Sequence, residues 1–437
     1  MGFWRKDFSE DEINHVLEQL KPLRKISDDG KVSLEGAGNI DMYTAFLVSA
    51  VGFDIRTDAL KARVVRSALF SPDLKVDFRE KDFRDVAYRL RRKYQVEDVK
   101  PYKVVFPLWN TPPFLNGVRK SQDVTINFSP SIATRIFKRI MRERDHQRSD
   151  RHYETFFSHA VVSDLRACST CVAHVVAHSS ADAQERASEA LYEILGLLNL
   201  AKDGGKFWRF SSRIGGKLPV ADVLIGPHTT THDVDGSLTH DGFWHENWVG
   251  GPSKKKPSQD HLDSWEKRYK QLSRGVAQSP WSGFCRSAAV RYFKAFSNPN
   301  LEESFLDGWR LFENISGSRY EKTETKVTRA SHIFKDNVEY RIVGKHLALR
   351  RHLISHGHAI NTGDEETLAF QMLQFVLPFL TRFILNGFSF ARPEEFWEFL
   401  DLPATRSKRL DEVEELQRRL RLYDKAAQFR GETDASS

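Results

Sequence analysis

One short segment of the sequence combines the side chains that cleavage of a phosphodiester needs. Residues 351–356 read Arg-His-Leu-Ile-Ser-His, with four residues between Arg351 and His356. A guanidinium stays charged at every working pH and can hold a phosphate through two hydrogen bonds, whereas an imidazole titrates near neutrality. Because helical residues four to five apart share one face, we expect both side chains to reach a single phosphate on a helix that ends at Gly357.

The spacing by itself is not selective. The chain has 16 histidines and many arginines, so an arginine followed at this distance by a histidine recurs by chance, and Arg341 and His346 have the same gap. The segment at Arg351 differs in its surroundings. The polar side chain of His352 follows the arginine directly, the interior of the segment is apolar, and predicted helices flank it on both sides.

Apolar residues at helical spacing predict a helical region around this segment. Four runs carry the pattern, at residues 285–296, 305–315, 340–351 and from Asp364 onward. Asp364 is the expected N-cap of the last helix. That helix has apolar positions stepping by three and four, and a second apolar set widens its apolar surface. We therefore expect this helix to be buried in a bundle. The first apolar set comprises Phe370, Leu373, Leu377, Leu380 and Ile384, and the second comprises Met372, Val376, Phe379 and Phe383.

The Arg-His-Leu-Ile-Ser-His pattern, the helix reading Trp-Arg-Leu-Phe-Glu-Asn-Ile at residues 309–315 before it and the long apolar helix after it together resemble the HEPN superfamily. The nearest likeness is to the Apea-like group of bacterial anti-phage and abortive-infection proteins. The resemblance covers about residues 280–392. It implies a helical bundle that forms a homodimer, so that two arginine-histidine motifs meet in one cleft, and a metal-independent endoribonuclease activity without a cofactor.

The resemblance also implies a role for each residue. Arg351 would bind the scissile phosphate, and His356 would act as general acid or base. His352 occupies the polar position that orients the motif, and Glu313 matches an acidic position on the second helix of Apea-like members. RNA supplies its own nucleophile, the 2′-hydroxyl, so DNA should be inert by this route.

Two other interpretations of this segment remain open. Arg351 and His356 could merely pair with carboxylates and cap a helix end. The bundle could also be a non-catalytic module that dimerises and binds a nucleotide or a partner protein, as in some members of the superfamily.

A histidine-rich stretch suggests a metal site as the second candidate chemistry. His228 and His232 are four residues apart and would converge on zinc if they lay on a helix. The intervening threonines predict a strand or loop instead, and a solvated loop is the favoured interpretation. Further polar residues follow in the sequence: Asp233, Asp235, His240, Asp241, His245 and Glu246.

Three cysteines offer only a weak signal. Cys168 and Cys171 have the spacing of a metal or redox pair, but Cys285 is the one cysteine left to complete a site. We expect Cys168 and Cys171 to be small buried residues at the start of a strand. An odd number of thiols favours a reducing compartment.

Composition limits the classes of protein that fit. The chain has 437 residues, 40% of them hydrophobic, and a net charge of +7, which excludes a disordered chain and slightly favours polyanionic partners. Charged residues occupy the start of the sequence, where a signal peptide would have an apolar core. No signal peptide is therefore expected, and the cytoplasm is the expected compartment. Residues 368–388 are apolar but include Gln371, Pro378 and Arg382, so no membrane span is expected.

The predicted fold class is an α+β N-terminal region followed by a mainly α, HEPN-like helical bundle. The expected domains are a helical region at 1–100, an α+β sensor or target-binding domain at 101–250, a linker and lead-in at 251–279, the bundle at 280–395 and a C-terminal helix and tail at 396–437. The expected partners are RNA, a second copy of the chain and a phage-derived trigger, with the N-terminal region restraining the nuclease.

Two basic helices in the N-terminal region offer a further route to RNA. They are predicted at residues 83–94 and 134–151, where Tyr88, Tyr94 and Phe137 could stack on bases. Acidic residues interrupt both, so solvated helix faces are an equal expectation.

Overall fold

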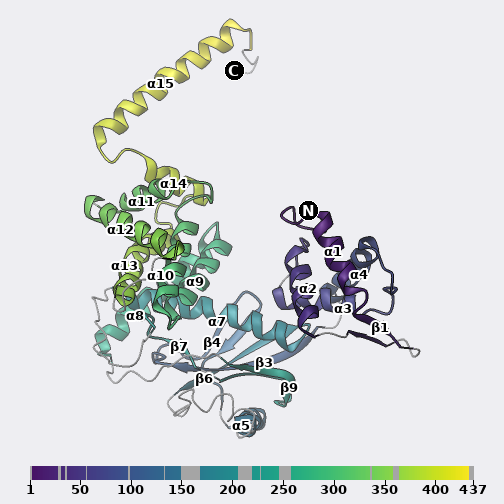
Figure 1. The fold of residues 1–437 in the computed structure, drawn as a ribbon. Helices are drawn as coiled ribbons and strands as arrows, with labels where there is room; N and C mark the ends of the chain where they lie inside the picture. Colours follow the sequence, from purple (N-terminus) through teal and green to yellow (C-terminus); the bar gives the residue numbers. More distant parts are fainter. Residues whose placement is uncertain are drawn as a thin grey trace. The chain divides into compact units, whose positions relative to one another are not determined.

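The structure is a computed structural model, and it describes residues 2–27, 31–34, 37–55, 57–96, 99–131, 133–148, 168–204, 219–226, 228–245, 257–334, 337–357 and 364–432. The chain forms two compact units. Unit 1 comprises Met1–Ile194 and Val223–Lys256, and unit 2 comprises Leu195–Asp222 and Pro257–Ser437. The fold is mostly helical with one substantial antiparallel sheet, in line with the predicted class at that level (Figure 1).

Unit 1 begins with four helices around an aromatic core. The helices are α1 (Glu10–Leu20), α2 (Ala37–Ala50), α3 (Asp58–Leu69) and α4 (Glu80–Val96), and the hairpin of β1 (Arg24–Ile26) and β2 (Val32–Leu34) lies between the first two. Ser9 and Glu12 form a capping box at the start of α1. The ring of Phe3 contacts those of Trp4 and Phe53.

The rest of unit 1 is built on a single antiparallel sheet. The strand order is β4-β5-β6-β3-β8-β9, and β7 pairs with β3 beside β8. The long β3 lies at the centre, with Val105 opposite Val172 on β6 and opposite Thr230 on β8. The strands are β3 (Lys100–Trp109), β4 (Val118–Ser121), β5 (Val124–Asn127), β6 (Ser169–Ala177), β7 (Leu224–Ile225), β8 (His228–His232) and β9 (Leu238–His245).

Two helices cover the sheet, one on each face (Figure 1). The face that carries Val105 and Val172 packs against α5 (Arg135–Arg148) through Phe137 and Ile140. On the other face runs α7 (Ser180–Asp203), whose last nine residues, 195–203, belong to unit 2. Strands with apolar residues on both faces are typical of a sheet that is covered on both sides.

Carboxylates on α7 hold the N-terminal helices against the sheet. The Thr57 hydroxyl caps α3, accepts a hydrogen bond from the Leu60 amide and donates one to Asp182 over 2.7 Å. The Asp58 and Ala59 amides donate to the Glu185 carboxylate. The N-terminal amides of α3 are therefore satisfied from another element, which joins the predicted 1–100 and 101–250 regions into one unit.

Unit 2 is a helical assembly. The C-terminal part of α7 packs closely on α9, since a Cβ atom on Gly196 would lie 2.1 Å from the Ala289 carbonyl oxygen. The Tyr292 hydroxyl on α9 donates to Asp203 at the end of α7. The other helices are α8 (Gln259–Gln278), α9 (Ser282–Ser297), α10 (Leu301–Ile315), α11 (Thr323–Ser331), α12 (Asn337–Ser355), α13 (Asp364–Leu385), α14 (Pro393–Asp401) and α15 (Arg406–Phe429).

The core of unit 2 is aromatic and centres on α13. The ring of Phe312 on α10 packs on Phe375 at a centroid distance of 4.9 Å, and Phe379 and Phe383 contact Phe396 on α14. The expectation that this helix is buried in a bundle is confirmed. The second predicted set of apolar residues is the more deeply buried one, because Phe370 and Leu377 of the first set are only partly buried.

Several predicted boundaries need correction. The segment 251–279 is not a linker throughout, because α8 occupies most of it and buries Tyr269 and Leu272. Residues 195–222, placed in the α+β domain, belong to unit 2. The predicted boundary between residues 100 and 101 falls inside β3, which begins at Lys100. Residues 207–210, which the sequence favours as a short strand, lie outside the described residues.

One described helix, α13, is long and apolar enough to cross a membrane by length and composition, over Glu365–Leu385. The core helix of a bundle satisfies the same criteria, and 56% of its most apolar window is buried inside this fold.

Candidate functional site

The segment with the predicted chemistry forms the end of α12, as its sequence indicates. The helix ends at Ser355, and the His356 amide donates to the carbonyl groups of His352 and Leu353. Gly357 follows with φ of +80°, the left-handed conformation that commonly terminates helices, and its amide donates to Ile354. The C-terminal end of the helix dipole is favourable for cationic groups at this position.

Arg351 points toward the neighbouring helix α10. Its Nη2 atom lies 3.8 Å from Oε2 of Glu313, and the two side chains are 41% and 27% exposed. The structure therefore brings together two of the four residues that the resemblance singles out. A pair this exposed contributes about 0–1 kcal/mol to stability.

Lys326 on α11 is a second cation near Glu313 that the sequence does not single out. It is buried, and its ammonium group donates a 2.9 Å hydrogen bond to the Glu313 carbonyl oxygen. Burial lowers the pKa of Lys326, and the carboxylates of Glu313 and Glu321 oppose this shift. The Glu313 carboxylate therefore lies in a locally positive environment, a feature with no signature in the local sequence.

His352 and His356 are the second pair that the structure brings together. Their rings meet edge to face, with centroids 4.4 Å apart, and both side chains are exposed. Adjacent imidazoles that reach solvent can exchange protons with a bound substrate.

The expectation that Arg351 and His356 share one helical face is wrong in detail. The two residues are five positions apart, which is about 140° around an α-helix at ~3.6 residues per turn. Arg351 therefore faces Glu313, whereas His356 lies with His352 on the solvent side. Among the described residues, no hydrogen bond or ion pair joins the arginine-glutamate pair to the histidine pair.

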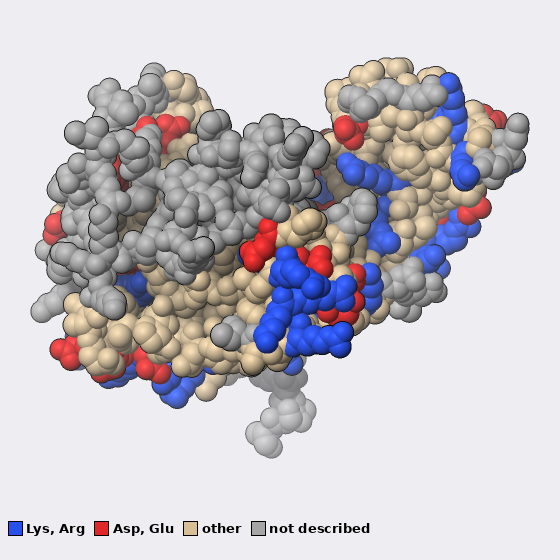
Figure 2. Space-filling view, turned by 90° about the horizontal axis from the view of Figure 1, so that it is seen from below, with Lys and Arg blue, Asp and Glu red and all other residues tan. Residues whose placement is uncertain are grey.

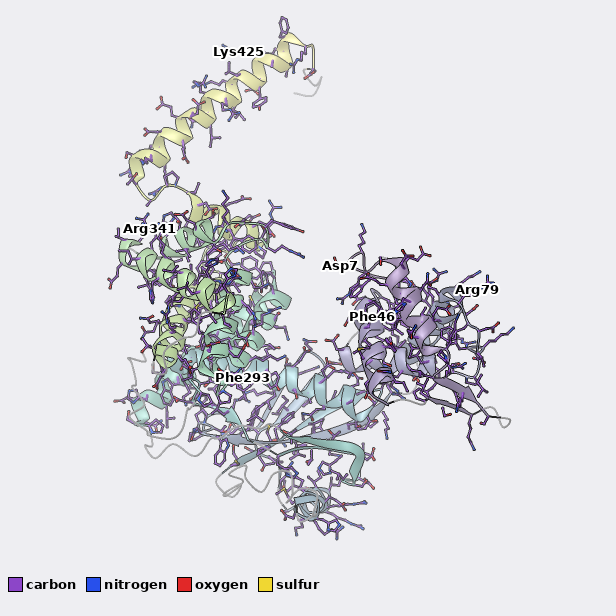
Figure 3. The ribbon with its side chains drawn as sticks, viewed as in Figure 1. Asp7, Phe46, Arg79, Phe293, Arg341 and Lys425 are labelled. Carbon is purple, nitrogen blue, oxygen red and sulfur yellow. The ribbon has the colours of Figure 1, made fainter. Side chains whose placement is uncertain are left out.

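The solvent side of α12 also carries large apolar residues. Val338, Ile342 and Leu349 are 52%, 62% and 56% exposed. Their steps of four and seven place them on the same face as the two histidines (Figure 3, where Arg341 marks this helix). The opposite side is tightly packed, because a Cβ atom on Gly344 would lie 2.6 Å from Val327 and 2.8 Å from Phe375.

The histidine-rich stretch has a different environment from the one predicted. It forms strand β8, and His228 and His232 are buried between the sheet and α5, so the solvated loop is wrong and the strand alternative is right. In a strand, residues four apart lie about 13 Å apart at ~3.3 Å per residue. The two imidazoles therefore cannot share a metal ion.

Hydrogen bonds account for both nitrogens of the His232 ring. Its Nδ1 lies 3.1 Å from the Gly236 carbonyl oxygen and so carries the proton, and its Nε2 accepts from the Thr230 hydroxyl over 2.9 Å. The buried Arg144 guanidinium donates to that hydroxyl over 2.6 Å and to the His228 carbonyl oxygen. Burial and the Arg144 charge lower the pKa of His232 to about 4.

Among the remaining residues of the suggested zinc site whose side chains are described, Asp235 is bound to protein groups. Asp235 binds the Ser237 amide and hydroxyl and the Arg139 guanidinium. The side chains of His240, Asp241 and His245, and Glu246 as a whole, lie outside the described residues. Within the part of the chain that is described, no three His, Cys, Asp or Glu side chains are grouped as metal ligands.

Cys171 and Cys285 have the environment of structural residues, whereas Cys168, also predicted to be buried, is only partly buried. Cys171 is fully buried in β6, and burial raises the pKa of its thiol. Burial also raises the pKa of the Cys285 thiol, to about 11. A reactive thiol needs the opposite shift, so a redox role for Cys168 and Cys171 is not supported.

Several basic side chains of the two predicted basic helices are buried or paired with carboxylates within the fold. Arg144 is buried, Arg139 pairs with Asp235 and Arg89 pairs with Asp73. Phe137 and Tyr94 belong to the core, so neither offers a stacking surface. On the face shown in Figure 2, Lys and Arg side chains gather with Asp and Glu side chains among them. Solvated or structural helix faces describe these elements better than a continuous nucleic-acid track.

Comparisons of this chain with protein-family models, with curated proteins and with solved structures find no match.

Proposed function

We propose that the chain is a metal-independent endoribonuclease of HEPN type, with its active site at the C-terminal end of α12. The observation that carries the proposal is the arrangement of four residues on two helices, α10 and α12, that an ion pair links. Glu313 on α10 orients the Arg351 guanidinium, and His352 and His356 place two adjacent imidazoles at the solvent-exposed end of α12.

The apolar side of α12 supports a dimeric site. Three large apolar side chains accompany the histidines on the exposed face, and a cluster of this kind is typical of an interaction surface. Pairing this face with the same face of a second copy would bury Ile342 and Leu349 and bring two histidine pairs into one cleft. The finer description of unit 2 as a HEPN-like bundle is part of this proposal.

The reaction that these residues suit is transesterification within RNA. One imidazole removes the proton from the 2′-hydroxyl, whose oxygen attacks the adjacent phosphorus. The Arg351 guanidinium stabilises the charge on the phosphorane, and a second imidazole protonates the departing 5′-oxygen. The products are a 2′,3′-cyclic phosphate and a free 5′-hydroxyl. Every atom comes from the substrate and from proton exchange with the histidines.

The substrate and its product ends provide the test. Full-length protein is incubated with a labelled single-stranded RNA and with the same sequence carrying 2′-deoxyribose at every position. The proposal predicts cleavage of the RNA alone, with 2′,3′-cyclic phosphate ends. Cleavage of both substrates, or 5′-phosphate products, would contradict it.

A non-catalytic module is the second candidate, since the Glu313–Arg351 ion pair would also hold α12 against α10 in a protein without activity. Such a module would bind a nucleotide or partner through Arg351 and cleave nothing. Loss of nucleotide binding in Arg351→Ala, together with absence of cleavage by the wild type, would support it.

The biological setting follows the resemblance: an anti-phage effector in the cytoplasm, restrained by its N-terminal region until a phage-derived trigger binds. The restraint is better tested in the full chain than in residues 280–437. Such a fragment lacks Asp203, which accepts a hydrogen bond from Tyr292, and Ala221, whose amide donates to Phe296. A bundle without these contacts would lose part of its own core.

A further inference from the structure

The C-terminal helix α15 exposes an apolar seam that no other element covers within the described residues. None of the side chains in its 24 residues is buried (Figure 3, where Lys425 marks this helix). The large apolar side chains of Val413, Leu416, Leu420 and Tyr423 are 48%, 64%, 65% and 68% exposed and form this seam. Leu410, Leu422 and Phe429 are also exposed on α15 but lie outside the seam. Most of the stability of a helix in a protein comes from packing of its apolar face, and within the described residues α15 has no such packing.

The spacing of these residues is that of a coiled coil. Val413, Leu416, Leu420, Tyr423 and Ala427 step by three, four, three and four, and so occupy successive a and d positions of a heptad repeat. A globular core helix has a wider apolar stripe. The narrow seam suits a single partner helix.

The charged residues beside the seam favour one partner and one orientation. With Leu420 at position a, Arg419 occupies a g position and Asp424 the following e position. In a parallel pair of identical helices, each g residue meets the next e residue of the other helix. Two symmetric ion pairs between Arg419 and Asp424 result.

An antiparallel pair with the same apolar layers has the opposite electrostatics. It places g residues near g residues, so that Arg419 of one helix lies beside Arg419 of the other. Like charges at this position oppose the arrangement.

We propose that α15 pairs with α15 of a second copy of this chain as a parallel, two-stranded coiled coil. This surface is separate from the exposed face of α12 and does not rest on the proposed function. Because no α15 side chain is buried within one chain, substitutions along the seam leave the rest of the fold intact.

Disulfide trapping in the full chain tests the pairing and its orientation. In a Cys168→Ser background, Leu416→Cys places thiols at a d position, where the two copies meet directly. Lys425→Cys, at an outward-facing f position of the same helix, is the matched control. We expect Leu416→Cys to form a covalent dimer at least about tenfold faster than Lys425→Cys on mild oxidation.

Equal rates for the two variants would overturn the coiled coil. A mixture of Leu416→Cys and Leu420→Cys proteins that forms mainly the mixed disulfide would overturn the parallel orientation, because these positions meet only in the antiparallel pair.

Charge reversal tests the ion pairs. Arg419→Asp replaces two attractions by two repulsions and should slow trapping of the Leu416→Cys dimer by about tenfold. Adding Asp424→Arg restores opposite charges across the helices and should return the rate to that of the parent. A double variant as slow as Arg419→Asp alone would show that the two residues do not meet.

Discussion

The Arg351 guanidinium on α12 lies 3.8 Å from the Glu313 carboxylate on α10, so two residues 38 positions apart in sequence form one pair at the edge of the helical unit. In the proposed reaction the arginine contacts the phosphate and the glutamate positions the arginine. Their substitutions should therefore have graded effects.

Arg351→Ala should lower RNA cleavage by at least about 100-fold, because it removes the group that stabilises the phosphorane. Glu313→Gln should lower it by only about tenfold, since the guanidinium stays in place but loses its orienting charge. Urea denaturation should show changes of no more than about 1 kcal/mol for both variants. Full activity of Arg351→Ala would remove the arginine from the mechanism.

The pH dependence of stability should include a contribution from His232. Its pKa is about 4 in the fold against an ordinary value of 6.5, so the unfolded chain binds the proton more readily. The contribution is fully present above pH ~6.5 and is lost as the pH falls through the window between these values. By about pH 5 the loss should be about 2 kcal/mol.

The urea midpoint of unfolding at about pH 7 and about pH 5 measures this effect. His232→Gln removes the titrating group and should flatten the dependence on pH, whatever its effect on absolute stability. A slope unchanged in His232→Gln would assign the acid sensitivity to other groups.

Arg329 should be among the residues most important for the stability of unit 2. It is buried on α11, donates two hydrogen bonds to Asp401 on α14 and a third to Glu321. Arg329→Ala leaves both carboxylates without their partner and should cost about 3–5 kcal/mol of unfolding free energy. Arg310→Ala, which breaks the exposed pair with Asp307, is the control and should cost less than about 1 kcal/mol. Equal losses in the two variants would contradict the assignment.

Gly344 should be required for the position of α12. An alanine there would place Cβ within 3 Å of Val327 and Phe375, so packing strain of about 1–3 kcal/mol should outweigh the gain in helix propensity. Gly283→Ala in α9 meets no atom within 4 Å and should be neutral or stabilising by up to about 1 kcal/mol. Thermal denaturation of both variants checks the prediction, and a Gly344→Ala protein as stable as the wild type would contradict it.

Sequence patterns predicted the elements whose signals are local. The end of α12 before Gly357, the helix over residues 285–296 and the strand at Cys171 all follow from turn residues and apolar periodicity. Contacts between distant segments escaped prediction. Arg144 appears as one more cation on a basic helix, and its burial depends on acceptors in β3 and β8 that only the folded sheet places nearby.

At the candidate site, too, local features could be predicted from the sequence and contacts between distant segments could not. The helix, its end and the adjacency of His352 and His356 could be predicted, because they depend on residues four apart. The opposite directions of Arg351 and His356 follow from helical geometry that the approximate spacing rule did not resolve. Lys326 could not be found, since its proximity to Glu313 arises from the packing of α11 on the end of α10.

The most direct test of the proposed ribonuclease activity is cleavage of a labelled single-stranded RNA by purified full-length wild type and His356→Ala, each with and without EDTA. We expect cleavage by the wild type that survives chelation and a loss of at least about 100-fold in His356→Ala. Cleavage that EDTA abolishes and that His356→Ala retains would contradict it.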